Sequence, residues 1–232
     1  AFSGGKTTVY EPGLRVPFVV YDPYVKVRGF RSQSIISHTD IVPSVLDFAG
    51  ELDHSKQRPK HWMPPEEYWQ EKPYATNENH GPRNGLLAYH GRSWLPILTD
   101  PDIEIHDVHF ASHTFHEIQM YYPMRAVSDH EWKLIWNIAH PLPYPFASDL
   151  WAASSWQSQY QRSLDAPYGS KTVKEYIYRP RFELYHIKED PEETTNLAND
   201  PDHARTLFKY QEKLKEMQQK FRDPWITKWN YE

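Results

Sequence analysis

Residues 1–21 constrain the fold more strongly than any other part of this chain. They contain a Gly-Gly-Lys turn at residues 4–6, a β-type run over residues 7–10 and a Pro-Gly turn at residues 12–13. The apolar residues at 16–21 then predict a buried strand. A strand that is buried on both faces needs partner strands and covering layers. We therefore expect the chain to be the back half of something larger, in which this strand completes a sheet.

A helix is predicted soon after this strand, over residues 37–50. Thr39 or Asp40 can cap its N-terminus, Pro43 fits its first turn and Gly50 ends it. A strand, a connection and then a helix are typical of the last unit of an α/β sheet. The first part of the chain is therefore interpreted as belonging to the α/β class.

The second half of the chain predicts a small antiparallel sheet of about four strands. Strands are indicated at residues 106–112, 125–127, 132–138 and 182–187. A C-terminal helix should begin at Asp200, end at Asp223 and pack an apolar stripe on the sheet. We divide the chain into residues 1–105, the tail of a large α/β domain with long loops, and residues 106–232, an antiparallel subdomain with the terminal helix.

Composition excludes several classes of protein. The chain has no cysteine, so it cannot form a disulfide, a thiolate metal site or a cysteine nucleophile. Its formal net charge of −5 argues against nucleic-acid binding, and no run of about 18 apolar residues predicts a membrane span. No Asn-x-Ser/Thr sequence occurs, which favours a bacterial periplasmic or secreted protein over a lysosomal one.

The aromatic content is high, with 9 Trp, 16 Tyr and 10 Phe. An aromatic core explains this composition directly, because each ring buries a large apolar area. The alternative is a sugar-facing surface, on which rings stack against pyranose faces while polar side chains bind the hydroxyls. The sequence leaves both interpretations open.

Three short stretches carry candidate functional residues. Lys6 follows paired glycines and could bind sulfate or phosphate, although an exposed turn lysine would look the same. His116 and Glu117, with His113 nearby, could perform acid–base chemistry or hold a polar substrate. A strand would place 113 and 117 on one face, whereas a helix would bring all three together. Arg125 could clamp an anion or form an ordinary salt bridge.

Two further groups are weaker candidates. His38 and Asp40 could form a ligand pair, but helix capping explains both residues more simply. The acidic residues within 100–107 could bind a cation, but acidic loop residues are usually solvated. We therefore predict no metal site within this chain.

Four motifs follow one another along nearly the whole chain. They are GGKTTVYEPGLRVPFVV at 4–20, SHTDIVPSVLDFAG at 37–50, HGRSWLPIL at 90–98 and FELYHIKEDPEETTNLAND at 182–200. In this order they resemble the C-terminal portion of the type I, formylglycine-dependent sulfatases of the alkaline phosphatase superfamily. Within that family, FHEIQMYYPMRAV and EWKLIWNIAHPLPYPFASDLW are most similar to the heparan N-sulfatases, or sulfamidases.

The resemblance implies roles for four residues. Lys6 matches the family's second active-site basic residue, which binds a sulfate oxygen and can be Arg in sulfamidases. A cation there would stabilise the charge on the transferring sulfuryl group. His116, Glu117 and Arg125 fall where sulfamidases place residues at or near the sugar-binding pocket.

The resemblance also implies components that lie outside this chain. The family requires a Cys- or Ser-x-Pro-x-Arg motif whose first residue becomes formylglycine, the nucleophile on sulfur, and neither motif occurs here. The calcium ligands are likewise expected elsewhere. The chain should therefore be inactive alone and supply one wall of the site, with the N-terminal part of the same sulfatase as its partner.

The predicted activity of the parent protein is hydrolysis of sulfate, with N-sulfate favoured, from a sulfated amino sugar of a glycosaminoglycan such as heparan sulfate. Two alternatives remain open. The parent could be an O-sulfatase acting on another sulfated glycan, or the chain could be a non-catalytic carbohydrate-binding or interaction module.

Overall fold

The computed structural model describes residues 5–52, 89–117 and 120–231. Their contacts group the chain into two compact units. The first unit comprises Ala1–Val19 with Phe110–Leu214, and the second comprises Val20–His109 with Lys215–Glu232. The opening segment thus packs with the second half of the sequence, whereas the division predicted at residue 105 placed it with the first half.

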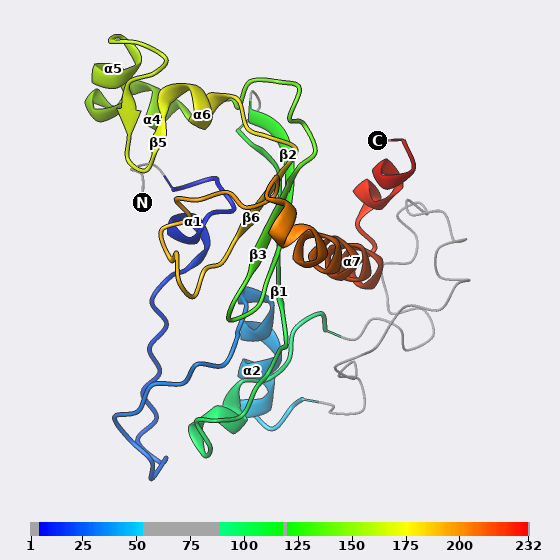
Figure 1. Ribbon diagram of the computed structural model, residues 1–232. Coiled ribbons are helices and arrows are strands. Elements are labelled where there is room, and N and C mark those ends of the chain that lie inside the picture. The colour runs from blue at the N-terminus through cyan, green and yellow to red at the C-terminus, as the bar shows by residue number, and fades with distance from the viewer. Residues whose placement is uncertain (1–4, 53–88, 118–119, 232) are drawn as a thin grey trace, which may run out of the picture. The chain divides into compact units, whose positions relative to one another are not determined.

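A four-stranded sheet is the scaffold of the first unit (Figure 1). The strands lie in the order β1-β2-β3-β6, with bounds His109–His116 for β1, Met120–Ser128 for β2, Lys133–Asn137 for β3 and Phe182–Tyr185 for β6. β2 pairs with β3 and β3 with β6, both antiparallel. The prediction of a small antiparallel sheet is confirmed.

Asp129 closes the β2–β3 hairpin and connects it to the C-terminal helix. One carboxylate oxygen accepts hydrogen bonds from the backbone N–H groups of Glu131 and Trp132, each at 3.0 Å. The other accepts from the Tyr210 hydroxyl and from the Lys213 ammonium. This turn therefore also fixes the position of the helix that carries Tyr210 and Lys213.

That helix, α7, spans Ala204–Phe221. It follows a 3₁₀ turn at Pro201–His203, which the side chain of Asp200 caps as predicted. Tyr210 and Leu214, from the predicted apolar stripe, are buried. The existence and the start of the C-terminal helix are thus confirmed.

Short elements between β3 and β6 carry an aromatic core. They are α4 (Ser148–Ala152), α5 (Ser154–Tyr160), β4 (Pro167–Tyr168), β5 (Lys171–Thr172) and α6 (Val173–Ile177). Tyr144, Trp156, Tyr168 and Tyr176 are buried there with ring centroids 4.9–5.7 Å apart. Much of the aromatic content therefore serves the core.

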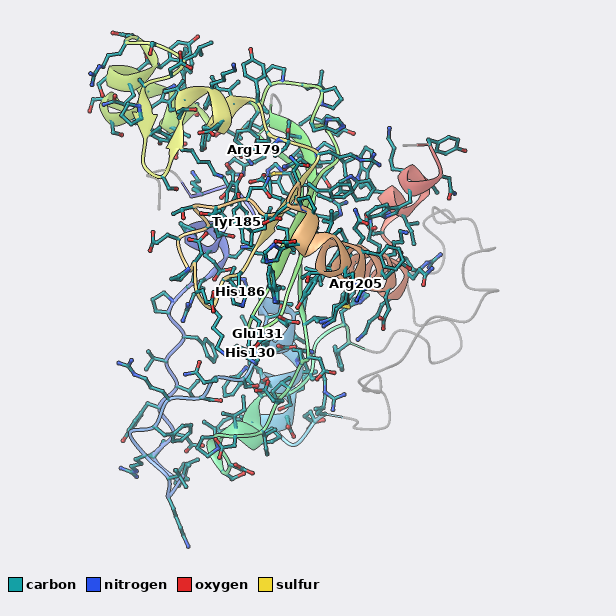
Figure 2. The ribbon with its side chains drawn as sticks, in the orientation of Figure 1. His130, Glu131, Arg179, Tyr185, His186 and Arg205 are labelled. Atoms are coloured by element: carbon teal, nitrogen blue, oxygen red, sulfur yellow. The ribbon has the colours of Figure 1, made fainter. Side chains whose placement is uncertain are left out.

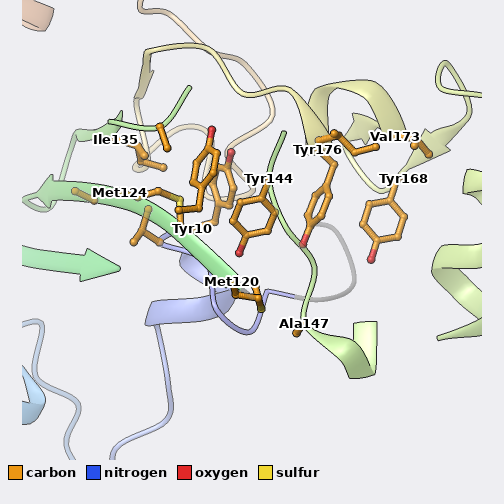
Figure 3. Close-up of a cluster of buried hydrophobic side chains, with 14 of the residues drawn as sticks. Tyr10, Met120, Met124, Ile135, Tyr144, Ala147, Tyr168, Val173 and Tyr176 are labelled. Atoms are coloured by element: carbon orange, nitrogen blue, oxygen red, sulfur yellow. The ribbon is translucent and has the colours of Figure 1, made fainter. Parts of the chain in front are cut away.

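The opening segment contributes directly to this core. Figure 3 shows Tyr10 beside Met124 of β2 and close to Tyr144. Arg179, labelled in Figure 2, is buried among the rings, with its guanidinium carbon 3.6 Å from the centroid of Tyr144. A cation over an aromatic face is stabilised by the ring quadrupole.

Asp40 organises the second unit at the start of α2, which spans Ile41–Phe48. The fully buried carboxylate of Asp40 accepts the N–H of Ser37 at 2.7 Å and lies 2.9 Å from Nε2 of His106. Ser37 caps the 3₁₀ turn His38–Asp40 that precedes α2 and forms a capping box with Asp40. Asp40, one of the two predicted residues, holds the N-cap position of α2 itself, although its side chain makes no cap hydrogen bond there. Gly50 adopts φ +73° and ends the helix, as predicted.

The motif at residues 90–98 packs against the start of α2. The N–H of Arg92 donates to the Asp40 carboxylate at 2.7 Å. Gly91 passes so close to the helix that a Cβ atom there would lie 2.2 Å from the carbonyl oxygen of Thr39. The motif contains a short 3₁₀ helix at Leu95–Leu98, and its glycine is required by a close backbone approach.

The strand predicted over residues 16–21 is wrong for this chain. These residues have no regular secondary structure, and Val19 is 89% exposed. No strand among the described residues pairs with them, so the apolar pattern lacks the neighbours that a strand needs. The β-type run at residues 7–10 likewise consists of turns and bends, and Pro12 and Gly13 lie in the one-turn helix α1 (Glu11–Leu14).

We predict that Asp129→Asn destabilises the protein and that the effect disappears in acid. Burial favours the neutral carboxyl, but hydrogen bonds from Lys213 and Tyr210 outweigh it and lower the pKa of Asp129 from 3.8 to about 2. The stabilisation is therefore complete above about pH 4 and is lost as the pH falls through about 2. After allowance for solvent screening, the expected loss at neutral pH is on the order of 1 kcal/mol.

Urea unfolding of wild type and Asp129→Asn at a series of pH values between neutrality and about 3 measures this effect. The difference in the free energy of unfolding should shrink as the pH falls below about 4. Asp165→Asn, which alters an exposed carboxylate, is the control. A difference that stays constant down to pH 3 would contradict the assignment.

Candidate functional site

Lys6 lies on a tightly bonded turn of the opening segment. The carbonyl oxygen of Gly5 accepts hydrogen bonds from the N–H and the hydroxyl of Thr8, at 3.1 and 2.6 Å. A Cβ atom at Gly5 would lie 2.6 Å from Cβ of Pro12, so only glycine allows the turn to close against α1. The turn therefore presents Lys6 from a well-packed base.

The ammonium of Lys6 lies beside polar side chains from two other segments. Its Nζ donates to Oδ2 of Asp149 at 2.8 Å. The hydroxyl of Ser148 donates to Oε1 of Glu117 at 3.3 Å, and Nε2 of His116 lies 3.9 Å from that same oxygen. Lys6, His116, Glu117, Ser148 and Asp149 thus form one group, here called the Lys6 cluster. Three of the four predicted site residues belong to it.

The Lys6 cluster is open to solvent and its charges are coupled. The side chains of Lys6 and Asp149 are 61% and 57% exposed. The hydrogen bond and the charge of Asp149 raise the pKa of Lys6, and the charge of Glu117 adds to this; Lys6 in turn lowers the pKa of Asp149. Lys6 is therefore fully protonated at neutral pH. Because exposed ion pairs are weak, an incoming anion can replace Asp149 at the ammonium.

The end of β1 determines how His116 and Glu117 are arranged. In a continuing strand these neighbours would point to opposite faces. β1 ends at His116, however, and Glu117 adopts a left-handed φ of +57°. This turn brings the two side chains together without the helix that the sequence offered as one alternative.

His113 is excluded from the Lys6 cluster by its hydrogen bond. Its Nδ1 lies 3.0 Å from the carbonyl oxygen of Tyr122, and because a carbonyl only accepts, Nδ1 carries the proton. Burial lowers the pKa of His113, so the ring is neutral at pH 7. We assign it to the connection between β1 and β2.

Arg125 is placed differently from the other predicted site residues. It lies on β2 and is only 4% exposed. Its Nη1 donates to the carbonyl oxygens of His113 and Met124, both at 2.8 Å, and Nη2 reaches Oγ1 of Thr114 at 3.4 Å. These bonds tie β1 to β2. The contribution of Arg125 to sugar binding stays a prediction.

Ser148 and Asp149 were not predicted from the sequence. They belong to α4; Asp149 meets Lys6 across 143 residues of sequence, and Ser148 donates to Glu117. The one local signal is an acidic residue in the first turn of a short helix. That signal does not indicate which distant residue the carboxylate will meet.

Within residues 5–52, 89–117 and 120–231, no three His, Asp or Glu side chains are arranged to hold a metal ion. In the same ranges no helix is long and apolar enough to cross a membrane.

Comparison with known proteins confirms that the chain is related to the sulfatases. It is 31% identical over 228 residues to human N-sulphoglucosamine sulphohydrolase, a match that covers 97% of this chain and 40% of that protein. It is 27% identical over 205 residues to the ulvan-active sulfatase of Formosa agariphila, covering 86% and 32%. The chain thus spans less than half the length of the curated relatives it matches.

Two solved structures are also similar. One is BT4656 in complex with its substrate D-glucosamine-2-N,6-O-disulfate, with a TM-score of 0.41 and 15% identity over 79% of this chain and 24% of that one. The other is BT1596, a 2-O GAG sulfatase, with a TM-score of 0.43 and 17% identity over 81% and 26%. No family model matches the chain.

We predict that Asp149→Asn lowers the pKa of Lys6. The substitution removes the charge and weakens the hydrogen bond that together raise this pKa. A ¹³C NMR titration of the lysine Cε atoms measures the change, and salt should diminish it because both groups are exposed. Asp200→Asn, which removes an exposed carboxylate paired with His203 instead, is the matched control and should leave Lys6 unchanged. An identical Lys6 titration in Asp149→Asn and wild type would show that the pair does not form in solution.

Proposed function

We propose that this chain is the C-terminal portion of a sulfatase that removes sulfate, with N-sulfate favoured, from a sulfated amino sugar of a glycosaminoglycan such as heparan sulfate. The observation that carries the proposal is the position of Lys6. It is an exposed and protonated cation on a packed turn, in a chain that is similar over 97% of its length to N-sulphoglucosamine sulphohydrolase.

The role proposed for Lys6 is electrostatic. A sulfate ester or a sulfamate carries a negative charge on its oxygens, and these oxygens remain charged while the sulfuryl group is transferred. A fixed ammonium beside them stabilises that charge most effectively when water is excluded. Asp149 holds Lys6 until the anion arrives, and the sulfate oxygen then takes the place of the Asp149 carboxylate.

The remaining members of the Lys6 cluster are suited to the sugar. Glu117, His116 and Ser148 offer both donors and acceptors for hydroxyl groups. Trp151, on the same short helix as Asp149, is 43% exposed, and its ring lies 5.3 Å from that of Tyr160. Exposed rings next to hydrogen-bonding groups fit the sugar-facing interpretation of part of the aromatic content.

Other components of the reaction are proposed to come from residues outside this chain. Formylglycine would supply the nucleophile on sulfur, and calcium would help to neutralise the sulfate. We further propose a periplasmic or secreted location in a bacterium, with a lysosomal location as the alternative.

An O-sulfatase acting on another sulfated glycan is the second candidate, because the ulvan-active sulfatase is also similar to this chain. Turnover of N-sulfated and of 6-O-sulfated glucosamine by the intact protein separates the two candidates. The gene upstream of Ala1 tests both: if it lacks a Cys- or Ser-x-Pro-x-Arg motif, the chain is better explained as a non-catalytic carbohydrate-binding module.

We predict that Lys6→Ala in the intact protein lowers kcat by at least about 10²-fold, the usual effect of losing one donor to the transition state. Lys6→Arg should retain much more activity because it keeps the charge. Lys188→Ala is the matched control, since Lys188 is also an exposed lysine near a carboxylate, that of Glu131 at 3.5 Å. Equal rates for Lys6→Ala and wild type would reject the proposed role.

A further inference from the structure

α1 follows the Lys6 turn directly and is held at its start by buried charges. The N–H of Glu11 donates to Oε2 of Glu193 at 2.6 Å. Nζ of Lys133, on β3, lies 2.9 Å from Oε1 of Glu11 and 2.8 Å from Oε1 of Glu193. The side chains of Lys133 and Glu193 are 0% and 1% exposed. One lysine and two carboxylates thus join α1 to the sheet where water is excluded.

The motif after β6 builds the loop that supplies Glu193. The carboxylate of Asp190 accepts the N–H of Thr194 at 2.8 Å, and the N–H of Glu193 donates to the carbonyl of Asp190 at 3.1 Å. Glu193 adopts a left-handed φ of +52°, which only a well-fixed loop maintains in a residue other than glycine. Asn196 accepts a backbone N–H of β6 at 2.9 Å and so fixes the loop to the sheet.

α1 in turn lies against the base of the Lys6 turn. A Cβ atom at Gly13 would be 2.3 Å from the carbonyl oxygen of Gly5 and 2.5 Å from that of Thr8. Gly5 also approaches Pro12, which is the second residue of α1. With contacts this close, any shift of α1 must shift the turn that carries Lys6.

The energetic character of these contacts favours a role in positioning. Removing charges from water is costly, and apolar side chains of similar volume often stabilise a core as well as a buried ion pair does. What the buried charges of Lys133 and Glu193 add is a defined geometry for α1. The N–H of Glu11 and the Lys133 ammonium must both meet the Glu193 carboxylate, so α1 has one position in which all of these bonds form.

We propose that Lys133 and Glu193 are positioning residues for Lys6, acting through Glu11 and α1. This inference rests on the proposed function, in which Lys6 binds the sulfate. The Asp-Pro-x-Glu loop at residues 190–193 then serves the active site without touching the substrate, by fixing the distance between the ammonium and the transferring sulfuryl group. A shift of about 1 Å in a catalytic group can lower the rate about 10²-fold.

A double-mutant cycle on the intact protein tests this inference. Glu193→Gln keeps an acceptor for the N–H of Glu11 and removes the charge that holds Lys133. We expect it to lower kcat about 10-fold with little change in KM, because Lys6 acts on the transition state. In the Lys6→Ala background the same substitution should lower kcat less than about 2-fold, since the residue through which it acts is already gone.

The control for a purely structural effect is Asp129→Asn. Asp129 also pairs with a lysine, Lys213, but makes no hydrogen bond to α1. Asp129→Asn should change kcat little, both in the wild-type background and in the Lys6→Ala background. Hydrogen exchange supplies a second readout: the backbone N–H of Leu14, which donates to Tyr10 within this segment, should exchange faster in Glu193→Gln but not in Asp129→Asn.

The possible outcomes distinguish this inference from the function on which it rests. Suppose that Lys6→Ala lowers kcat but that Glu193→Gln lowers kcat by the same factor in the wild-type and Lys6→Ala backgrounds. The inference is then overturned and the proposed function stands. If Lys6→Ala retains the wild-type rate, the role of Lys6 fails and the inference fails with it. Should Glu193→Gln not fold, Glu193→Asp and Lys133→Arg are milder variants for the same cycle, and a wild-type kcat in both would overturn the inference.

Discussion

The buried carboxylate of Glu183 is the contact on which the first unit depends, because it joins the opening segment to the sheet. Both of its oxygens accept the hydroxyl of Tyr10 at 2.8 Å, and Asn137 donates to one of them at 2.7 Å. Burial opposes ionisation, but the charges of Lys171 and Arg179 outweigh it and hold the pKa of Glu183 below its usual range. Without this anchor, the buried hydroxyl of Tyr10 would lose the carboxylate to which it donates, and the opening segment that carries Lys6 would lose this bond to the sheet.

Regular elements that depend on local signals were predictable, and those that depend on neighbours were not. The β2–β3 hairpin follows from Asp129 and the β-rich runs on either side, and α7 follows from Asp200 and its apolar stripe. The run at residues 16–21 has an equally clear apolar pattern but no pairing strand among the described residues, so it stays extended and exposed. A segment forms a strand only where a neighbouring strand pairs with it, and the sequence of the segment alone does not show whether that neighbour is present.

The residues of the candidate site also differ in whether local sequence signals indicate them. The glycine turn indicated Lys6 because an anion site needs a close backbone approach and a cation, both of which are local features. Asp149 could not be predicted, since its partner lies 143 residues away and the aromatic core brings the two together. Arg125 shows the opposite case: a residue suited to binding an anion bonds backbone carbonyls inside the sheet. Side-chain chemistry alone cannot distinguish these uses, because burial decides which partner is available.

The motifs that identify the relatives of this chain are mostly parts of the scaffold. Glu183 and Asn196 hold β6, Gly91 packs on α2, and none of the three belongs to the Lys6 cluster. The side chains proposed to bind the sugar, such as Glu117 and Ser148, lie in segments with little local pattern. Under the proposed function, the scaffold motifs fix where the Lys6 ammonium lies relative to the sheet, and the residues around Lys6 would select among sulfated sugars. The proposed function therefore assigns the distinction between sulfated sugars to the Lys6 cluster and the positioning of that cluster to the scaffold motifs.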